Sequence, residues 1–194
     1  MKKSAELRAL ARAQLKGTWL AAVVVCLVYS VILGLSSLIV VGSLVLGGPL
    51  ALGYAGYFLK KSRGEPAKLE DLFDGFEQFG SAFLLGLLQF IFITLWFCLL
   101  IVPGIIKCFS YSMSFYIMKD NPNIGALEAI TQSRKMMAGH KGRLFCLGLS
   151  FIGWGLLCCL TFGIGVLWLA PYISASVANF YVDLKSHHES LAAQ

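Results

Sequence analysis

Lys107 is the side chain whose type and position most directly suggest chemistry. It stands alone in an apolar run, and an ionisable residue inside a membrane segment is by default a functional hypothesis. Ser110 and Ser114 follow at i+3 and i+7, so on a helix they share its face. Together with Gln89 these residues could line a polar path for a small solute. The alternative is that the Lys107 ammonium snorkels to a nearby outer surface.

A second candidate site is a basic group near the end of an amphipathic stretch. Arg134, Lys135, Lys141 and Arg143 lie within ten residues, beside His140. Such a cluster attracts the phosphates of anionic lipids. It could equally dock an acidic segment at 69–79, or act only as a determinant of membrane orientation.

Motifs for catalysis or metal binding are absent from the sequence. There is no acid pair, HExxH, GxSxG, phosphate loop or Cys/His ligand spacing. The six cysteines lie in apolar segments without a CxxC pair, where Cys behaves as a small hydrophobe. His187-His188 is interpreted as part of a solvated tail rather than as a metal site. We therefore predict no catalytic residues, no metal, no cofactor and no enzymatic activity.

Composition indicates the solvent in which these residues lie. Of the 194 residues, 58% are hydrophobic and 13% are charged, and the mean hydropathy is +0.76. A soluble domain has roughly 45–50% apolar and about 25% charged residues, so a lipid bilayer is the expected solvent. The net charge of +6 comes from short basic runs beside apolar segments, a pattern typical of orientation signals and not of nucleic-acid binding.

The apolar segments predict an all-α membrane protein. The chain, residues 1–194, is predicted to be a single multi-pass membrane domain. The polar N-terminus lacks the apolar core of a signal peptide, so the first segment is expected to remain as an anchor. Six transmembrane helices are predicted, at about 18–40, 44–59, 80–102, 105–118, 144–160 and 166–182.

The fourth of these segments decides the topology. Residues 105–118 are fewer than the roughly 20 that a span needs, and they follow a Pro103-Gly104 break that predicts a tight turn. If they did not cross, Arg134 to Arg143 would lie outside, against the positive-inside rule. If every segment crosses and the N-terminus is inside, 15 of the 16 Lys and Arg share the cytoplasmic side, with Lys107 the exception. The charges therefore favour six crossings, with both termini cytoplasmic.

Three amphipathic helices complete the predicted architecture. They lie at 4–16, 67–79 and 124–138, each on the cytoplasmic side before a hairpin of two spans. Ser4 is the expected N-cap of the first, and Gly17 its C-terminal stop. The first helix is expected to lie in the membrane interface with its cations near anionic headgroups. From Asp183 the tail is expected to fray.

Several motifs carry a resemblance to a known family. PGIIK (Pro103–Lys107), DNP (Asp120–Pro122), ALEAI (Ala126–Ile130), SRKMMAGHKGRLF (Ser133–Phe145), LSFIGW (Leu149–Trp154), TFGIG (Thr161–Gly165) and the pairs Pro171-Tyr172 and Phe180-Tyr181 carry it. These resemble the bacterial family called domain of unknown function 975. A looser similarity runs to the membrane region of some glycerophosphodiester phosphodiesterases, whose catalytic domain this sequence lacks. The resemblance implies a bacterial multi-pass membrane protein and carries no activity with it.

The sequence therefore predicts a non-enzymatic protein of the bacterial cytoplasmic membrane that acts as a scaffold, regulatory or lipid-interacting module. The expected partners are anionic lipid headgroups and a membrane protein or a second copy of the chain. The alternative is a small-solute transporter or channel with Lys107 lining its path.

Overall fold

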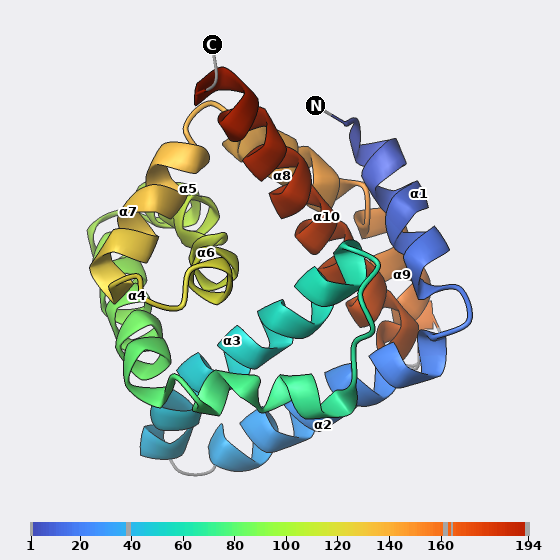
Figure 1. Cartoon of the computed structure of the whole chain (residues 1–194), viewed down its shortest axis with the longest axis horizontal. Coiled ribbons are helices and arrows are strands. Elements are labelled where there is room, and N and C mark those ends of the chain that lie inside the picture. Colours follow the sequence, from blue (N-terminus) through green and yellow to red (C-terminus); the bar gives the residue numbers. More distant parts are fainter. Residues whose placement is uncertain (1, 38–39, 161–162, 164, 193–194) are drawn as a thin grey trace.

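The protein is all-helical over the residues that the structure, a computed structural model, describes, namely 2–37, 40–160, 163 and 165–192. No strand occurs among these residues (Figure 1). The elements are α1 (Ser4–Leu15), α2 (Trp19–Ser37), α3 (Val40–Ser62), two 3₁₀ turns η1 (Leu69–Leu72) and η2 (Asp74–Phe76), α4 (Phe79–Leu99), α5 (Ile101–Tyr111), α6 (Ser114–Asp120), α7 (Ala126–Met136), α8 (Lys141–Leu149), α9 (Ile152–Leu160) and α10 (Val166–Ala192).

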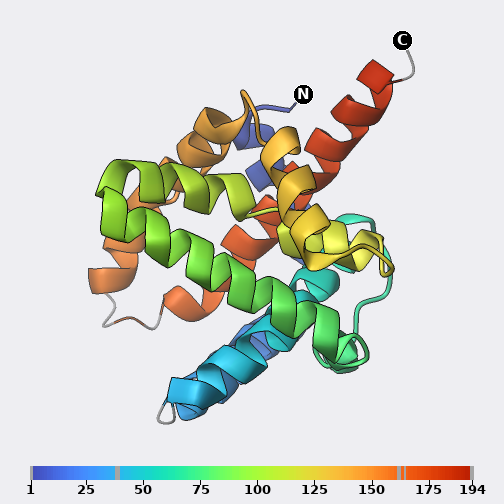
Figure 2. The same ribbon diagram turned by 90° about the vertical axis from the view of Figure 1, so that its left-hand side faces the viewer.

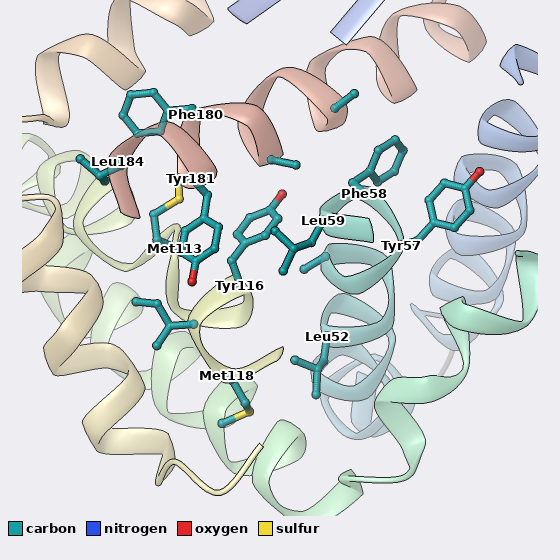
Figure 3. Close-up of a cluster of buried hydrophobic side chains, with 14 of the residues drawn as sticks. Leu52, Tyr57, Phe58, Leu59, Met113, Tyr116, Met118, Phe180, Tyr181 and Leu184 are labelled. Carbon is teal, nitrogen blue, oxygen red and sulfur yellow. The ribbon is translucent and has the colours of Figure 1, made fainter. Parts of the chain in front are cut away.

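The core lies where α3, α6 and α10 meet. Figure 3 shows aromatic and aliphatic side chains of these three helices pointing toward one another. Phe58 and Phe180 are fully buried, and the rings of Tyr116 and Tyr181 stack with centroids 5.3 Å apart. Burying a large side chain of this kind stabilises the fold by roughly 1.5–3 kcal/mol. The short α6 is thereby fixed between two long helices.

Membrane-crossing capacity is smaller than the sequence predicts. In the described residues, three segments are long and apolar enough to cross: Phe79–Leu99, Ile101–Asp120 and Lys141–Cys158. A fourth is possible if α1 and α2, bent by 101° at their break, count as one span. The prediction of six spans is therefore wrong. The predicted spans 44–59 and 166–182 fall on α3 and α10, which are not among the candidates.

Composition and packing explain why α3 and α10 differ from the other helices. The C-terminal half of α3 ends in Lys60-Lys61, and α10 carries Asn179 and Asp183. Both helices also supply the interior, since Phe58 and Phe180 are fully buried in the core. In contrast, only 11% of the candidate span in α4 is buried inside the protein. The strongly apolar α4 thus lies at the surface of the helix bundle, whereas α3 and α10, which also carry polar residues, form its interior.

The predicted helix at 67–79 is wrong as an α-helix. The chain forms η1 and η2 there, and α4 begins only at Phe79. Gly75 explains the difference, because a Cβ at this position would overlap the Pro49 carbonyl oxygen of α3. Gly53 of α3 makes the matching approach to the Leu72 carbonyl. Backbone contact with α3 therefore outweighs the helical period of the apolar residues.

The predicted turn at Pro103-Gly104 is also displaced. The helix breaks instead at Leu100, whose backbone is extended with φ −161° and ψ 137°. Pro103 lies in the first turn of α5, where a missing N–H costs nothing. Because α5 and α6 follow each other closely, the segment Ile101–Asp120 reaches 20 residues, and the shortness predicted for 105–118 disappears.

The other two amphipathic helices are confirmed by α1 and α7. Gly17 and Gly139, which follow them, have φ of +84° and +77°, as expected for glycine stops. Lys3, not Ser4, is the N-cap of α1, and its backbone N–H donates to Glu6. The apolar face of α1 packs on the protein, with Ala11 fully buried, rather than being free for the membrane interface.

The C-terminal segment does not fray at Asp183. Helix α10 continues to Ala192, and Asp183 accepts hydrogen bonds from the backbone N–H of Lys2 at 3.1 and 3.0 Å. The residues before α1 thus lie beside α10 at Asp183. In Figure 2, α4 and α5, in green, run antiparallel. The Phe97 ring of α4 lies close to Gly104 of α5.

Candidate functional site

Ion pairs gather on the segments that the sequence assigns to one side of the membrane. Asp120 holds Arg63 and Lys185 at 2.7 Å each and accepts a hydrogen bond from Tyr181 at 2.9 Å. Its side chain is 4% exposed. The carboxylate therefore ties the end of α6 to α3 and α10.

Two acidic residues of the 3₁₀ turns form a second group of ion pairs. Asp71 pairs with Lys60 at 2.7 Å, and Asp74 pairs with Lys60 at 3.4 Å and Lys119 at 3.3 Å. The hypothesis that the acidic segment at 69–79 docks on the basic group near Arg134 is therefore wrong. Its partners are on α3 and α6 instead.

Arg143, one of the four predicted binding residues, is also used within the protein. Its guanidinium lies 3.1 Å from the Asp183 carboxylate, donates to the Lys2 carbonyl oxygen and covers the Phe180 ring at 5.4 Å. These contacts join α8, α10 and the N-terminus. Arg143 is a structural cation in this arrangement.

The remaining predicted cations form what we call the basic face: Lys107, Arg134, Lys135 and Lys141. Arg134 and Lys135 are exposed on α7, and Lys107 and Lys141 are half-buried on α5 and α8. None of the four is joined to a carboxylate by a salt bridge in the described part of the chain. The basic face could therefore pair with an anion that is not part of this chain.

Lys107, which the sequence sets apart from the other cations, lies close to two of them in the structure. Its ammonium lies 4.5 Å from the centroid of the Trp96 ring, a cation–π distance. It is also within electrostatic range of Arg134 and Lys141. The packing of α5 against α7 and α8 brings these charges together, which the linear order of the chain does not reveal.

Apolar and polar surfaces border the basic face. Phe145, one turn after Lys141 on α8, is 49% exposed. On the other side, a cavity of about 230 Å³ lies between α7 and α10. Its lining includes Lys135, Gln132, Asn121, Lys185 and His188. Cations beside an exposed aromatic ring are typical of surfaces that contact anionic lipid.

Sequence comparison supplies the family. The model for "Protein of unknown function (DUF975)" matches residues 1–107 and 97–188, which together cover almost the whole chain. The chain belongs to the DUF975 family. No curated protein and no solved structure matches it. The looser similarity to glycerophosphodiester phosphodiesterases is not shown by these comparisons.

In this DUF975 protein three of the four predicted polar-path residues, Gln89, Ser110 and Ser114, lie near the break between α5 and α6. Gln89 and Ser114 both donate to the Tyr111 carbonyl oxygen, at 2.8 and 2.9 Å. Ser110 donates to Ile106, and its own carbonyl accepts from Ser133. The carbonyl groups of Ser110 and Tyr111, at the C-terminal end of α5, thereby gain hydrogen-bond partners, and an unpaired buried carbonyl would be costly.

Lys107 is not part of that polar group, since its ammonium lies on Trp96. The buried serines and the lysine are therefore brought near each other by α5 but make separate contacts. The signal missed at the sequence level is Ser133, which supplies the hydrogen bond from α7 and is fully buried.

Histidines also gather at this end of the DUF975 protein. His140 lies beside His187 and His188, with ring centroids 5.8 and 6.2 Å away. His188 is hydrogen-bonded to the Met136 carbonyl oxygen at 3.1 Å. The two histidines are thus packed rather than in a solvated tail. Among the described residues, no three His, Cys, Asp or Glu side chains are placed to hold a metal ion.

Proposed function

We propose that this DUF975 protein is a non-enzymatic multi-pass protein of the bacterial cytoplasmic membrane whose basic face binds anionic lipid headgroups. In this role it acts as a scaffold or regulatory module, with a membrane protein or a second copy as its further partner. The observation that carries the proposal is that Lys107, Arg134, Lys135 and Lys141 lack carboxylate partners, whereas all six ion pairs of the described chain lie elsewhere.

A cytoplasmic location of both termini fits this proposal. Lys2 and Asp183 are hydrogen-bonded to each other, so both ends of the chain belong to one side of the molecule. Arg143, in the segment that the positive-inside rule assigns to the cytoplasm, joins the same contact. The basic face follows on from it along α8 and α7.

The expected strength follows from the number of cations. Each Lys or Arg near an anionic surface contributes about 1 kcal/mol at moderate salt. Removing two charges therefore weakens binding by about 2 kcal/mol, or about 30-fold. Because these cations are exposed or half-buried, the preference falls as salt rises.

The test measures how purified full-length protein in neutral detergent binds phosphatidylglycerol and phosphatidylcholine. The double variant Arg134→Gln/Lys135→Gln removes two cations of the basic face. The matched control, Lys16→Gln/Lys68→Gln, removes two exposed cations that lie outside it. We expect the first variant to lose its preference for phosphatidylglycerol and the control to keep it. Equal behaviour of the two variants would rule out the basic face.

The alternative function, a small-solute transporter, places Lys107 on the path. The observation that favours it is the group of polar side chains next to the α5–α6 break, the half-buried Gln89 and the buried Ser110 and Ser114. A proteoliposome flux assay decides, with Lys107→Ala as the variant. A flux that this substitution abolishes would favour transport over lipid binding.

A further inference from the structure

The largest cavity among those described lies between α1, the start of α2, α9 and the start of α10. Figure 1 shows α1 and α9 on the opposite side of the molecule from α5 and α7 of the basic face. Its volume is about 560 Å³, within the range of about 300–1,000 Å³ that small-molecule sites occupy. Most of its wall is aromatic or aliphatic. The lining residues that the argument uses are Arg12, Trp19, Trp154, Leu157, Trp168 and Tyr172.

Three of the chain's four tryptophans line this cavity. The rings of Trp19 and Tyr172 lie 6.4 Å apart at its inner wall. Trp154 and Trp168 are 47% and 53% exposed, so these two lining residues also form part of the protein surface. Tryptophan is enriched at the level of lipid headgroups, where one end of the ring meets hydrocarbon and the other meets water.

Arg12 provides the one charge among the described residues that line the cavity. Its guanidinium donates to the Tyr172 hydroxyl at 3.2 Å and lies 5.6 Å from the centroid of that ring. It has no carboxylate partner in the described chain. Guanidinium has five donors in a planar fork and stays charged at all relevant pH, so donors remain for an anion.

A second guanidinium supports the positive character of this region. Arg8 lies one turn before Arg12 on α1 and donates to the Ser150 carbonyl oxygen at 3.3 Å. Its Nε is buried and lacks a hydrogen-bond partner in the structure. Phe151, which Arg8 covers at 6.0 Å, packs against Tyr172. Two cations of α1, one lining the cavity and one a turn away, are thus without a salt bridge in the described part of the chain.

The surface around the opening is apolar. Leu157, which lines the cavity with the two exposed tryptophans, is itself 53% exposed. A free inorganic anion gains little from an aromatic cavity, and a neutral hydrocarbon gains nothing from Arg12. The combination fits a molecule with one acyl chain to bury and one anionic group to pair.

We propose that this cavity binds a single anionic phospholipid, with one acyl chain between Trp154 and Trp168 and its phosphate paired with Arg12. The site differs from the basic face, since it takes one lipid in a shaped cavity, whereas the basic face attracts headgroups by charge. The proposal rests on the membrane location proposed above, but not on lipid binding by Arg134 and Lys135.

Tryptophan fluorescence provides the test. In a Trp96→Phe background, all emission comes from Trp19, Trp154 and Trp168. The full-length protein in neutral detergent is titrated with phosphatidylglycerol or phosphatidylcholine that carries brominated acyl chains. We expect saturable quenching by the anionic lipid at a lower concentration than by the zwitterionic one.

Arg12→Gln is expected to weaken that quenching about tenfold, the size of one charge-assisted hydrogen bond. Arg12→Lys should restore part of the affinity. Lys16→Gln, four residues after Arg12 at the C-cap of α1 and outside the cavity lining, is the matched control and should leave it unchanged. Native mass spectrometry provides a second readout, with one retained phosphatidylglycerol in the parent protein and none in Arg12→Gln.

Three outcomes would overturn the proposal. They are equal quenching by both lipids, equal affinity of Arg12→Gln and Lys16→Gln, and full competition by glycerol phosphate without a chain. A failure of the proposed lipid binding by the basic face would be distinguishable from these outcomes, because Arg134→Gln/Lys135→Gln should leave the tryptophan quenching intact.

Discussion

Replacement of Asp120 tests the ion-pair group that holds the core helices together. The side chain of Asp120 is 4% exposed and contacts Arg63, Lys185 and Tyr181 at 2.7 to 2.9 Å. Asp120→Asn keeps the shape but removes the charge and turns one acceptor into a donor. Because all three partners donate, the amide N–H₂ group would face donors.

The magnitude follows from the burial of the partners. Breaking a fully buried ion pair costs about 3–5 kcal/mol. Here the Arg63 and Lys185 side chains are each 35% exposed and can regain water, so we expect about 2–4 kcal/mol. For a chain of this length each kcal/mol lowers the melting temperature by roughly 2–4 °C, which gives a decrease of about 5–15 °C.

Size-exclusion chromatography after heating the detergent-solubilised protein measures this decrease. Glu128→Gln is the matched control, since Glu128 is exposed on α7 and takes part in no salt bridge of the described chain. Tyr181→Phe, which removes one hydrogen bond to the carboxylate, should lie between the two. A melting temperature of Asp120→Asn equal to that of Glu128→Gln would refute the reasoning.

Three further predictions concern other contacts. Gly75→Ala places a Cβ on the Pro49 carbonyl and 2.8 Å from the Gly53 nitrogen, so we expect little folded protein by gel filtration, whereas Gly80→Ala, with open space around it, should fold normally. Lys61→Met should leave the melting temperature unchanged or raise it, because Lys61 is 8% exposed without a salt bridge in the described chain and burial lowers its pKa; a marked decrease would contradict this. The pKa of His140 is lowered by burial, then by Arg143, His187 and His188, so the unfolded state binds more protons. The contribution of neutral His140 to the free energy of unfolding is therefore complete above the ordinary His pKa of about 6.5 and decreases as the pH drops below that value. Melting of the parent protein should be more sensitive to this change than melting of His140→Gln.

The parts of the fold that sequence predicts are those decided locally. Helices α1 and α7 have an apolar face of helical period and a glycine stop, and both signals lie within the helix itself. The family is likewise carried by contiguous motifs. The 3₁₀ turns at 69–76 share the same apolar period, but Gly75 must fit under Pro49 of α3. That requirement comes from a distant segment, so no local pattern reveals it.

The break before α5 shows a second limit. Pro103-Gly104 looks like a stop, yet proline is tolerated in the first turn of a helix. The actual break, at Leu100, is a residue with no turn preference. Gly104 has a packing role, because a Cβ there would lie 2.8 Å from the Phe97 ring. Pro103 and Gly104 therefore lie near the turn but not in it. Pro103 belongs to the first turn of α5, and Gly104 allows α5 to pack closely on α4.

Contacts with distant segments also separate the candidate site residues into paired and unpaired cations within the described chain. Arg134 and Arg143 belong to one basic cluster in the sequence, yet Arg143 pairs with Asp183, 40 residues away, and Arg134 has no salt bridge in the described chain. Residue type predicts the charge of such a side chain, but only the fold determines whether the charge is neutralised.

The cations that form salt bridges have a structural role besides any role in membrane orientation. Lys60, Arg63, Lys119, Arg143 and Lys185 pair with four carboxylates and hold the helices of one end together. If these cations served only to orient the chain in the membrane, moving one of them to the basic face would not change the stability of the fold. The contacts argue against such an exchange, because a cation moved from Arg63 to α7 would leave Asp120 buried without one of its partners. Among the described residues, the cations of the basic face and the two α1 arginines take part in none of these salt bridges, so their charge remains for the anionic lipids proposed above.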